Sequence, residues 1–538
     1  MRRTSLLVAT LVALSLGCSD LASVAAADEP PGGTLRGPTV PTRTAPAMLA
    51  LQQAERLFDG VPGNHRVSGD AADGARDATL VLRDLAVRVD QLSGAQKRRA
   101  QAILARPSEG VNDPDLHGYT VPEEHKCTQH FCMHWVSSTA DAPAAADANK
   151  DGVPDWVKTN ADVFENVWRR IVSDGDPRTR DLGYRAPKSD LSSPEHGPDG
   201  KLDIYLADIG GDGLYGYCTS DDPNLGPHRW DVSAFCVVDN DFARSQFGGA
   251  KPQNSLRVTA AHEFFHAVQY SYDSGEDRWF MEGTAVWMED QIYDNINDNL
   301  QYLTESALAN PSVPVDDGDP THLYGSWVFW RFLTERLGSS VVRRVWQRAD
   351  AASGGANEYS MQALRNVTHA MGRRFVRTFA DFGAANQISH RWYHEGASYP
   401  QAPAAATVTL SPSTLVSRRV QARINHLTNV SVVARAASLV GHWRLRVTLD
   451  MSDPTLGSAA TVLVHRTHGK PVWHRLRLGP RGNAVLTVPF SPSAVSSVAV
   501  TMTNASTRYT CRQGTVMSCQ GRPKDNGLKS SVGFRAIR

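Results

Sequence analysis

Residues 259–270 read TAAHEFFHAVQY, and residues 279–290, which follow closely, read WFMEGTAVWMED. Two histidines four positions apart on a helix project from the same face, so His262 and His266 can reach one metal ion. Zn²⁺ with three protein ligands keeps a fourth position for water, and a neighbouring carboxylate can take a proton from that water. The pattern therefore predicts a zinc hydrolase site in which Glu263 is the general base.

The residues that flank the two histidines favour this interpretation over an ordinary pair of surface or core histidines. A largely apolar helix is buried, and two histidines and a glutamate are costly to bury unless they have partners. We expect the two phenylalanines of the motif to pack in the core rather than to contact a substrate. The apolar flanking residues are Leu256, Val258, Ala260, Ala261, Phe264, Phe265 and Val268.

The second stretch carries a family resemblance. Its segment WFMEGTAVW resembles the Trp-x-x-Glu-Gly-x-Ala segment of the gluzincins, the clan that contains thermolysin and the zinc aminopeptidases, and the resemblance covers about residues 255–335. It implies that Glu282 is the third zinc ligand. The histidine-based metzincin pattern fails, because its Gly and His positions are Gln269 and Tyr272 here. The interval between His266 and Glu282 is shorter than in the best-known gluzincins.

Two further side chains are candidates for the same site. Glu289 lies seven residues after Glu282 and therefore on the same helical face, so it competes for the ligand position. We assign it instead to orienting a ligand histidine through its other ring nitrogen, the alternative being a solvated helix carboxylate. Gluzincins take an oxyanion donor from a downstream Tyr or His, and THLYGSWVFW (residues 321–330) contains both types, His322 and Tyr324, of which we choose Tyr324. The alternative for Tyr324 is simple aromatic packing.

An acidic loop precedes this region. Residues 147–155 read DANKDGVPD, and oxygen side chains at alternate positions before a glycine are typical of a Ca²⁺ loop. The twelfth position, normally a bidentate Glu, is Lys158. The alternative is a turn that caps a helix over residues 156–172. The predicted calcium ligands are Asp147, Asn149, Asp151 and Asp155.

The N-terminus predicts export. Arg2 and Arg3 precede an apolar run over residues 6–17, and small residues follow up to position 27, which is the pattern of a secretory signal peptide. Lipid attachment at Cys18 is the weaker alternative. We therefore expect a secreted, extracellular protein without a membrane span. With the signal peptide removed, six cysteines remain, and their spacing favours disulfides between Cys127 and Cys132, Cys218 and Cys236, and Cys511 and Cys519.

Composition limits the kinds of partner. The chain has 56 basic and 56 acidic residues, a balance that argues against electrostatic capture of nucleic acid or an anionic membrane. Its 538 residues are too many for one ordinary domain, and with 41% hydrophobic residues it can bury sizeable cores. We expect two or three domains and a monomer.

The pattern along the chain predicts an α+β fold with four segments. Residues 1–27 are the signal peptide, and residues 28–112 are a helical segment that is either a propeptide or a permanent extension. Residues 113–397 are expected to form a two-lobed, zincin-like metallopeptidase domain, with strands over 131–136 and 202–207 and helices over 322–337, 338–351, 360–371 and 373–387. After a Pro/Ala-rich linker, residues 408–538 contain short runs in which apolar and polar residues alternate, separated by turn residues. This is the pattern of a β-sandwich. Five strands are expected there, at 432–433, 445–449, 460–464, 484–488 and 497–502.

These features together predict a secreted zinc endopeptidase that acts on a protein or peptide substrate. A zinc aminopeptidase would share the ligand set, but it would need an acidic anchor for the free amine, and no Gly-x-Met-Glu-Asn-type segment precedes the helix. A third hypothesis is a catalytically inactive binding or adhesion protein whose C-terminal domain does the work.

Overall fold

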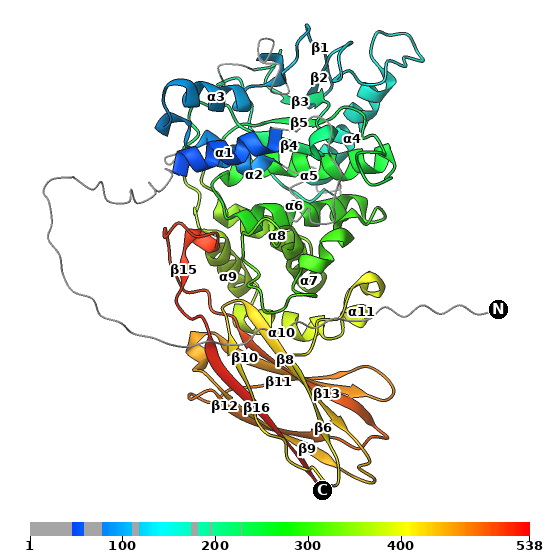
Figure 1. Ribbon diagram of the computed structural model, residues 1–538, viewed down its shortest axis with the longest axis vertical. Helices are drawn as coiled ribbons and strands as arrows, with labels where there is room; N and C mark the ends of the chain where they lie inside the picture. The colour runs from blue at the N-terminus through cyan, green and yellow to red at the C-terminus, as the bar shows by residue number, and fades with distance from the viewer. Residues whose placement is uncertain (1–45, 59–77, 110–117, 174–180, 194–195, 227–228) are drawn as a thin grey trace, which may run out of the picture. The chain divides into compact units, whose positions relative to one another are not determined.

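The computed structural model describes residues 46–58, 78–109, 118–173, 181–193, 196–226 and 229–538. The predicted signal peptide and Cys18 lie outside the described residues. Within them the chain has a mixed α+β fold, with a first sheet, a central helical region and a C-terminal region of several β-sheets (Figure 1).

The first sheet is mixed and has five strands in the order β1-β2-β3-β5-β4. Strands β2, β3 and β5 run parallel, and β1 and β4 are antiparallel to their neighbours at the two edges. The strands expected at 131–136 and 202–207 are β2 and β3. The bounds are β1 (Glu124–Cys127), β2 (Phe131–Trp135), β3 (Leu202–Ala207), β4 (Gly216–Thr219) and β5 (Phe235–Asp239).

Both faces of this sheet are covered. In β3, Ile204 and Leu206 belong to the cluster that includes Phe264, whereas Tyr205 and Ala207, between and after them, belong to a separate cluster on the other face. Side chains alternate between the faces of a strand, so this division means that two layers of helix enclose the sheet. It also explains why the strands are apolar throughout rather than alternating.

The N-terminal helices form one of those layers. They are α1 (Pro46–Phe58), α2 (Thr79–Ala86) and α3 (Gly94–Leu104), with short 3₁₀ turns η1 (Val89–Gln91) and η2 (Pro107–Glu109). Leu51, Leu82 and Leu85 pack with Tyr217 and Val237 of the sheet. In Figure 1 these helices, in blue, lie beside the strands. The described part of the predicted helical segment is therefore mainly helical, with short connections between the helices.

The other layer begins with α4 and α5 and continues into the central helices. The helices expected at 322–337, 338–351, 360–371 and 373–387 correspond to α7 to α10, the first preceded by a 3₁₀ turn. The bounds are α4 (Asp155–Ile171), α5 (Pro252–Asp273), α6 (Arg278–Tyr293), η4 (Asp298–Glu305), η5 (Tyr324–Ser326), α7 (Trp327–Leu337), α8 (Ser340–Ala349), α9 (Ser360–Ala370), α10 (Phe375–Asn386) and α11 (Ser389–Trp392), with η3 (Gly210–Asp212) and η6 (Gly396–Ser398).

The C-terminal region contains a five-stranded and a four-stranded sheet, in the orders β11-β10-β13-β8-β6 and β12-β9-β16-β7, and a two-stranded sheet β14-β15. Val462 and Val500 of the first and Val447 and Val532 of the second share one apolar core. The bounds are β6 (Ala406–Leu410), β7 (Val420–Ile424), β8 (Thr428–Ala436), β9 (Arg444–Met451), β10 (Ser458–Arg466), β11 (Val472–Arg475), β12 (Asn483–Pro489), β13 (Val495–Asn504), β14 (Tyr509–Thr510), β15 (Arg522–Pro523) and β16 (Leu528–Ile537), with η7 (Pro454–Leu456) and η8 (Ser518–Gln520).

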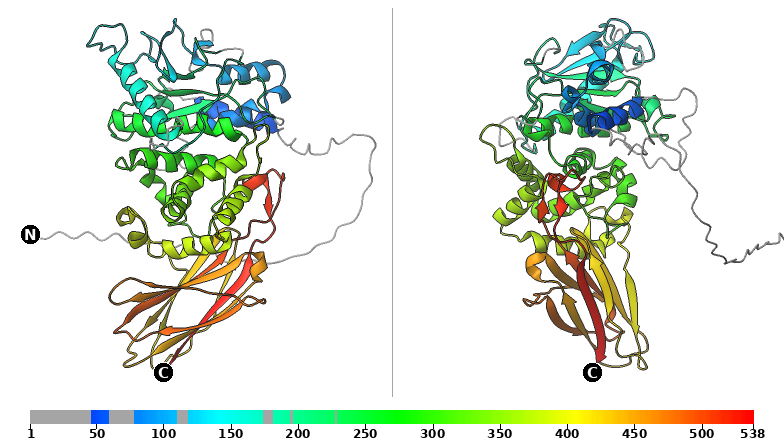
Figure 2. Two further views of the ribbon diagram at one scale, coloured as in Figure 1. Left: turned by 180° about the vertical axis from the view of Figure 1, so that it is seen from behind. Right: turned by 60° about the vertical axis from the view of Figure 1, so that its left-hand side comes forward.

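Polar contacts join this region to the central helices. Asp381 of α10, a helix that lies against β10 and β13, accepts hydrogen bonds from Arg475 of β11 (Figures 1 and 2). Asp316, which precedes η5 in the chain, is bonded to His426 and Tyr509. The two sets of elements are therefore fixed to each other by buried charges as well as by apolar contacts.

The three predicted disulfides are present. They join Cys127 to Cys132, Cys218 to Cys236, and Cys511 to Cys519. Disulfides are typical of proteins that fold in an oxidising, extracellular environment. Among the described residues, no helix combines the length and the apolar character that crossing a membrane requires.

Candidate metal centre

Helix α5 is buried along almost its whole length, because it lies between the first sheet and α6. Its first residue is Pro252, which suits an N-terminal position where no backbone N–H is needed. After α5 ends at Asp273, a short turn reverses the chain into α6. Arg83 of α2 holds this turn by donating to the carbonyl oxygens of Ser274 and Glu276, at 3.3 and 2.9 Å. The antiparallel helix pair thus brings the two sequence motifs face to face.

Three side chains meet between these helices. The Nε2 atom of His262 lies 3.2 Å from Oε2 of Glu282, and Nε2 of His266 lies 3.6 Å from the same oxygen. One ligand atom from each residue falls within 4.8 Å of the other two, which is a spacing that a single ion can bridge. The two histidines and the glutamate predicted as zinc ligands are therefore brought together.

The chemistry of this group fits a metal ion. Glu282 is 1% exposed, and within the described part of the chain neither of its carboxylate oxygens makes a hydrogen bond. A buried carboxylate without hydrogen bonds is costly, and a bound cation removes that cost. Two imidazoles and one carboxylate are also a ligand set used by catalytic zinc. The residues present could thus hold a metal ion such as Zn²⁺.

The second ring nitrogens of both histidines are also engaged. Nδ1 of His262 lies 2.7 Å from Oε1 of Glu289, which is the contact expected for that glutamate. Nδ1 of His266 lies 2.7 Å from Oε1 of Gln269, whose Nε2 donates to the Met281 carbonyl at 2.9 Å. Such partners fix the ring orientation and leave Nε2 facing the metal position. Gln269 was missed by the sequence analysis, although its place three residues after His266 puts it on the same helix face.

Two glycines permit the close packing around the centre. A Cβ atom on Gly283 would lie 2.1 Å from Oγ of Ser326, so only glycine lets α6 approach the start of α7 this closely. A Cβ on Gly216 would lie 2.8 Å from Cγ of Glu263, so the lack of a side chain at this position lets edge strand β4 lie close against α5. The glycine that follows Glu282 in the motif therefore has a packing role.

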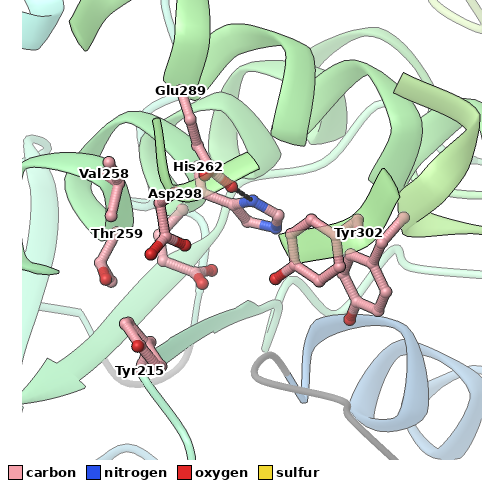
Figure 3. A pocket seen from close by; sticks show the side chains of 9 residues that line it. Tyr215, Val258, Thr259, His262, Glu289, Asp298 and Tyr302 are labelled. Carbon is pink, nitrogen blue, oxygen red and sulfur yellow. Dashed lines mark hydrogen bonds and ion pairs between the residues drawn. The ribbon is translucent and has the colours of Figure 1, made fainter. Parts of the chain in front are cut away.

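A pocket opens beside the centre (Figure 3). Glu263 and His262 line it, and so does Tyr324, whose ring centroid lies 6.5 Å from that of His262. Tyr302, which no sequence motif indicated, stacks on Tyr324 with a centroid distance of 5.1 Å and an interplanar angle of 18°. The pocket is lined by Tyr215, Val258, Thr259, His262, Glu263, Glu289, Asp298, Tyr302 and Tyr324.

Thr79, in the N-terminal layer, contacts a residue that lines this pocket. Oγ1 of Thr79, in α2, donates to Oε2 of Glu263 at 3.5 Å and accepts a hydrogen bond from the backbone N–H of Cys218 in β4 at 2.8 Å. The same hydroxyl therefore touches both the sheet edge and the predicted general base. Nothing in the sequence motifs pointed to Thr79.

The predicted calcium loop is also assembled, but around a lysine. Nζ of Lys158 lies 3.1 Å from Oδ1 of Asp147, 2.5 Å from Oδ1 of Asn149 and 2.9 Å from Oδ1 of Asp151. It lies 3.4 Å from Oδ1 of Asp155 as well. All four predicted ligands thus surround one ammonium group, and calcium binding there stays a prediction.

Comparisons with known proteins give a partial match. Residues 249–399, which contain α5, α6 and Tyr324, match a family model described as a family of unknown function (DUF6055). The comparison with curated proteins found no match. Among solved structures, the chain is similar to a novel β-glucosidase from Paenibacillus barengoltzii, with 15% identity, a TM-score of 0.12, and coverage of 24% of this chain and 12% of that one.

A second solved structure is similar over a longer part of the chain. It is a GH115 4-O-methyl-α-glucuronidase with specificity for decorated arabinogalactans, with 9% identity, a TM-score of 0.14, and coverage of 52% of this chain and 41% of that one. The chain therefore spans less than half the length of either protein. At these TM-scores neither likeness bears on the fold or the function of this protein.

Proposed function

We propose that this protein is a secreted zinc endopeptidase with a two-lobed, gluzincin-like catalytic domain. The observation that carries the proposal is the meeting of His262, His266 and the buried, unbonded carboxylate of Glu282 beside a pocket. The resemblance of the second motif to the gluzincin segment agrees with this arrangement. In this proposal the first sheet and α5 belong to one lobe, and the helices from α6 onward belong to the other.

The side chains around the pocket then have separate roles. Zinc, when bound, supplies the Lewis acidity that activates water and polarises a peptide carbonyl. Glu263 accepts the proton of the attacking water and returns it to the leaving amine, for which its position on the pocket wall is suitable. Tyr324 offers its hydroxyl to the carbonyl oxygen as negative charge develops there. Glu289 and Gln269 keep both histidine rings in place.

A zinc aminopeptidase and an inactive adhesion protein remain as alternatives. Against the inactive protein, the ligand set and the general base are all of the required residue types. In favour of the aminopeptidase, one carboxylate in the pocket, that of Asp298, is a candidate acidic anchor for an amine. Endopeptidase activity is preferred because the sequence lacks the exopeptidase segment that precedes the motif helix in aminopeptidases.

The proposal is tested by removing and restoring the metal. The purified protein is treated with a chelator, dialysed, and assayed on unfolded casein before and after addition of one equivalent of Zn²⁺. We expect hydrolysis to be lost with the zinc and regained on its return, with internal fragments showing an endopeptidase. Release of N-terminal residues alone would support the aminopeptidase. A protein that takes up no zinc and cleaves nothing would leave the adhesion hypothesis.

A further inference from the structure

We infer that the outer face of the four-stranded sheet β12-β9-β16-β7 binds an acidic polysaccharide. The contacts are made by arginine and lysine side chains that project from β7, β9 and β16, strands of the C-terminal region (Figure 1). The inference uses no residue of the candidate metal centre, so it does not depend on the proposed function.

The outer face is defined by the alternation of side chains along each strand. Leu445 and Val447 of β9 belong to the core between the two large sheets, so Arg444 and Arg446 project away from that core. The same alternation in β16 and in β7 continues the face. Its exposed basic residues are Arg419, Arg423, Arg444, Arg446, Lys529 and Arg535, and its one exposed acidic residue within these described strands is Asp450.

This concentration of positive charge is local. The chain as a whole has 56 basic and 56 acidic residues, yet residues 396–449 contain six arginines and neither aspartate nor glutamate. A surface on which charges of one sign gather attracts a partner of the opposite sign, even when the whole protein is neutral.

Two pairs of these cations lie directly opposite each other. Arg446 of β9 is paired with Arg535 of β16, and Lys529 of β16 is paired with Arg423 of β7. Like charges in directly opposed positions destabilise a sheet. Among the residues that the structure describes, no carboxylate lies within ion-pairing distance of either pair. A bound anion removes this repulsion, which makes the face complementary to a negatively charged partner.

A hollow in the face provides a place for one anionic group. It measures about 290 Å³ and is lined by Arg419, Arg446 and Arg535, with Gly533 and Thr448 between them. Gly533 is opposite Thr448 in the sheet, and a Cβ atom there would lie 3.3 Å from Cγ of Arg419. A glycine inside a strand is typical of places where another molecule approaches the backbone closely. Three guanidinium groups around such a hollow suit a sulfate or a carboxylate, which they can bind in a bidentate manner.

The extent of the face favours a chain over a single ion. Lys529 and Arg535 are six residues apart along β16, which corresponds to about 20 Å. No outward residue of these four described strands is aromatic, so the face lacks the stacking platforms that bind single-stranded nucleic acids. Its exposed large apolar residues are two separate valines, Val416 and Val485, rather than the anchors of a membrane-binding surface. Disulfides are typical of extracellular proteins, and basic clusters in such proteins bind acidic polysaccharides.

The experiment measures binding of octasaccharides to the full-length protein by isothermal titration calorimetry. The heparin octasaccharide carries sulfate and carboxylate groups, the polygalacturonate octasaccharide carries carboxylates alone, and maltooctaose is neutral. We expect at least one acidic octasaccharide to bind about tenfold or more tightly than maltooctaose. Its affinity should fall as the NaCl concentration is raised, because salt screens exposed charges.

Two variants separate the charges from the hollow. Arg446→Gln/Arg535→Gln should weaken binding by at least about tenfold, without lowering the unfolding temperature, since it removes an opposed pair of like charges. Gly533→Val fills the hollow and leaves every charge in place, and it should weaken binding by about threefold or more. The control is Arg435→Gln/Arg466→Gln, which removes two exposed arginines from the other large sheet and should change the affinity less than about twofold.

Equal binding of acidic and neutral octasaccharides overturns the inference, and so does a loss of affinity in the control as large as that in Arg446→Gln/Arg535→Gln. Tighter binding of a DNA duplex, or of phosphatidylglycerol vesicles, than of either acidic octasaccharide would assign the face to nucleic acid or to a membrane instead. Bound zinc should be the same in all variants, so the result is independent of the metal centre.

Discussion

Each histidine of the candidate centre is held at its Nδ1 atom by a different kind of partner. His262 meets the carboxylate of Glu289, and His266 meets the amide of Gln269. A carboxylate partner makes an imidazole a stronger donor toward a metal than a neutral amide does, because its charge increases the electron density on the ring. The two ligands should therefore respond differently when their partners are changed.

Glu289→Gln is expected to lower the affinity for zinc by about 10-fold to 100-fold without unfolding the protein, since the hydrogen bond is kept and only the charge is lost. Affinity is measured by competition with a chromogenic chelator. Asp294→Asn, an exposed aspartate just beyond the end of the same helix, is the matched control and should leave the affinity unchanged. An unchanged affinity in Glu289→Gln would show that the glutamate has no orienting role.

The residues of the candidate centre that belong to a sequence motif could be predicted. His262, His266 and Glu282 have fixed spacing on two helices, so their convergence could be expected. Tyr302 and Thr79 could not, because each reaches the pocket, or a residue that lines it, only through the tertiary packing of a segment distant in sequence. Their residue types occur throughout the chain and carry no signal by themselves.

The N-terminal helices behave as a structural layer of the first sheet. Arg106, which follows α3, is 1% exposed and is bonded to the carboxylates of Asp190, Asp203 and Asp221. Removing the segment would uncover one apolar face of the sheet and leave these aspartates without their cation. The segment packs as a layer of the sheet, and its removal as a propeptide stays a hypothesis from the sequence.

Arg106→Gln is expected to destabilise the protein by about 3–5 kcal/mol, because it leaves buried carboxylates uncompensated. The measurement is the urea unfolding midpoint, followed by near-ultraviolet circular dichroism. Arg98→Gln, an exposed arginine on α3, is the control and should shift the midpoint little. If Arg106→Gln behaved like the control, the N-terminal layer would contribute little to the stability of the sheet.

The loop before α4 presents its oxygens to Lys158, so calcium must compete with a tethered ammonium. Lys158→Gln is therefore expected to raise the affinity of the loop for Ca²⁺ by about tenfold or more, through loss of charge repulsion. Calorimetric titration of both proteins with CaCl₂ measures the change. Absence of calcium binding in both would contradict the predicted site and leave a lysine-bridged turn.

Helices and strands whose apolar residues recur at a regular spacing were predicted well. Helices α7 to α10 and strands β2 and β3 lie within a few residues of their predicted positions. Strands β7 and β16 were missed, because VQARI and LKSSVGFRAI mix charged and small residues on the face that turns to solvent. They are strands because β16 pairs with β9 and β7 pairs with β16, which completes the four-stranded sheet through contacts between distant segments.

The C-terminal sheets and the central helices are tied together by a buried ion pair. Nε2 of His426 lies 2.8 Å from Oδ1 of Asp316, and Tyr509 donates to Oδ2 of the same aspartate at 2.7 Å. Burial by itself would lower the pKa of His426, but the charge and hydrogen bond of Asp316 raise this pKa above 6.5. Burial likewise opposes ionisation of Asp316, yet His426 and the hydrogen bonds lower its pKa below 3.8.

The pair should make the stability of the molecule depend on pH. A raised histidine pKa stabilises the folded state fully below pH 6.5, and this contribution is lost as the pH rises through the folded-state pKa. A lowered aspartate pKa stabilises fully above pH 3.8, and this contribution is lost as the pH falls through the folded-state pKa. The full effect therefore lies between these two values.

His426→Gln is accordingly expected to cost more stability at pH 5.5 than at pH 8.5, with about 3 kcal/mol lost at the lower pH. Thermal unfolding at both pH values measures the difference. His468→Gln, an exposed histidine of the same β region, serves as the control. A loss in His426→Gln that is equal at the two pH values would contradict the charged pair.

The mixed α+β character of the chain and its C-terminal region of β-sheets could be predicted, because the period of the apolar residues changes along the sequence. The docking of the C-terminal sheets on α10 and the double covering of the first sheet could not be predicted. Both depend on which apolar faces meet, and every amphipathic element offers such a face. Pairs such as Asp316 with His426 are likewise visible only after the fold has joined positions more than a hundred residues apart.

The central claim is that the group of His262, His266 and Glu282 binds zinc while Glu263 acts on the water. The most direct measurement compares casein hydrolysis and bound zinc in the wild type and in Glu263→Gln. The account predicts that the variant retains one zinc per chain and loses activity by at least about a thousandfold, because the base is gone and the ligands remain. A variant that keeps its zinc and still cleaves casein at the wild-type rate would contradict the account.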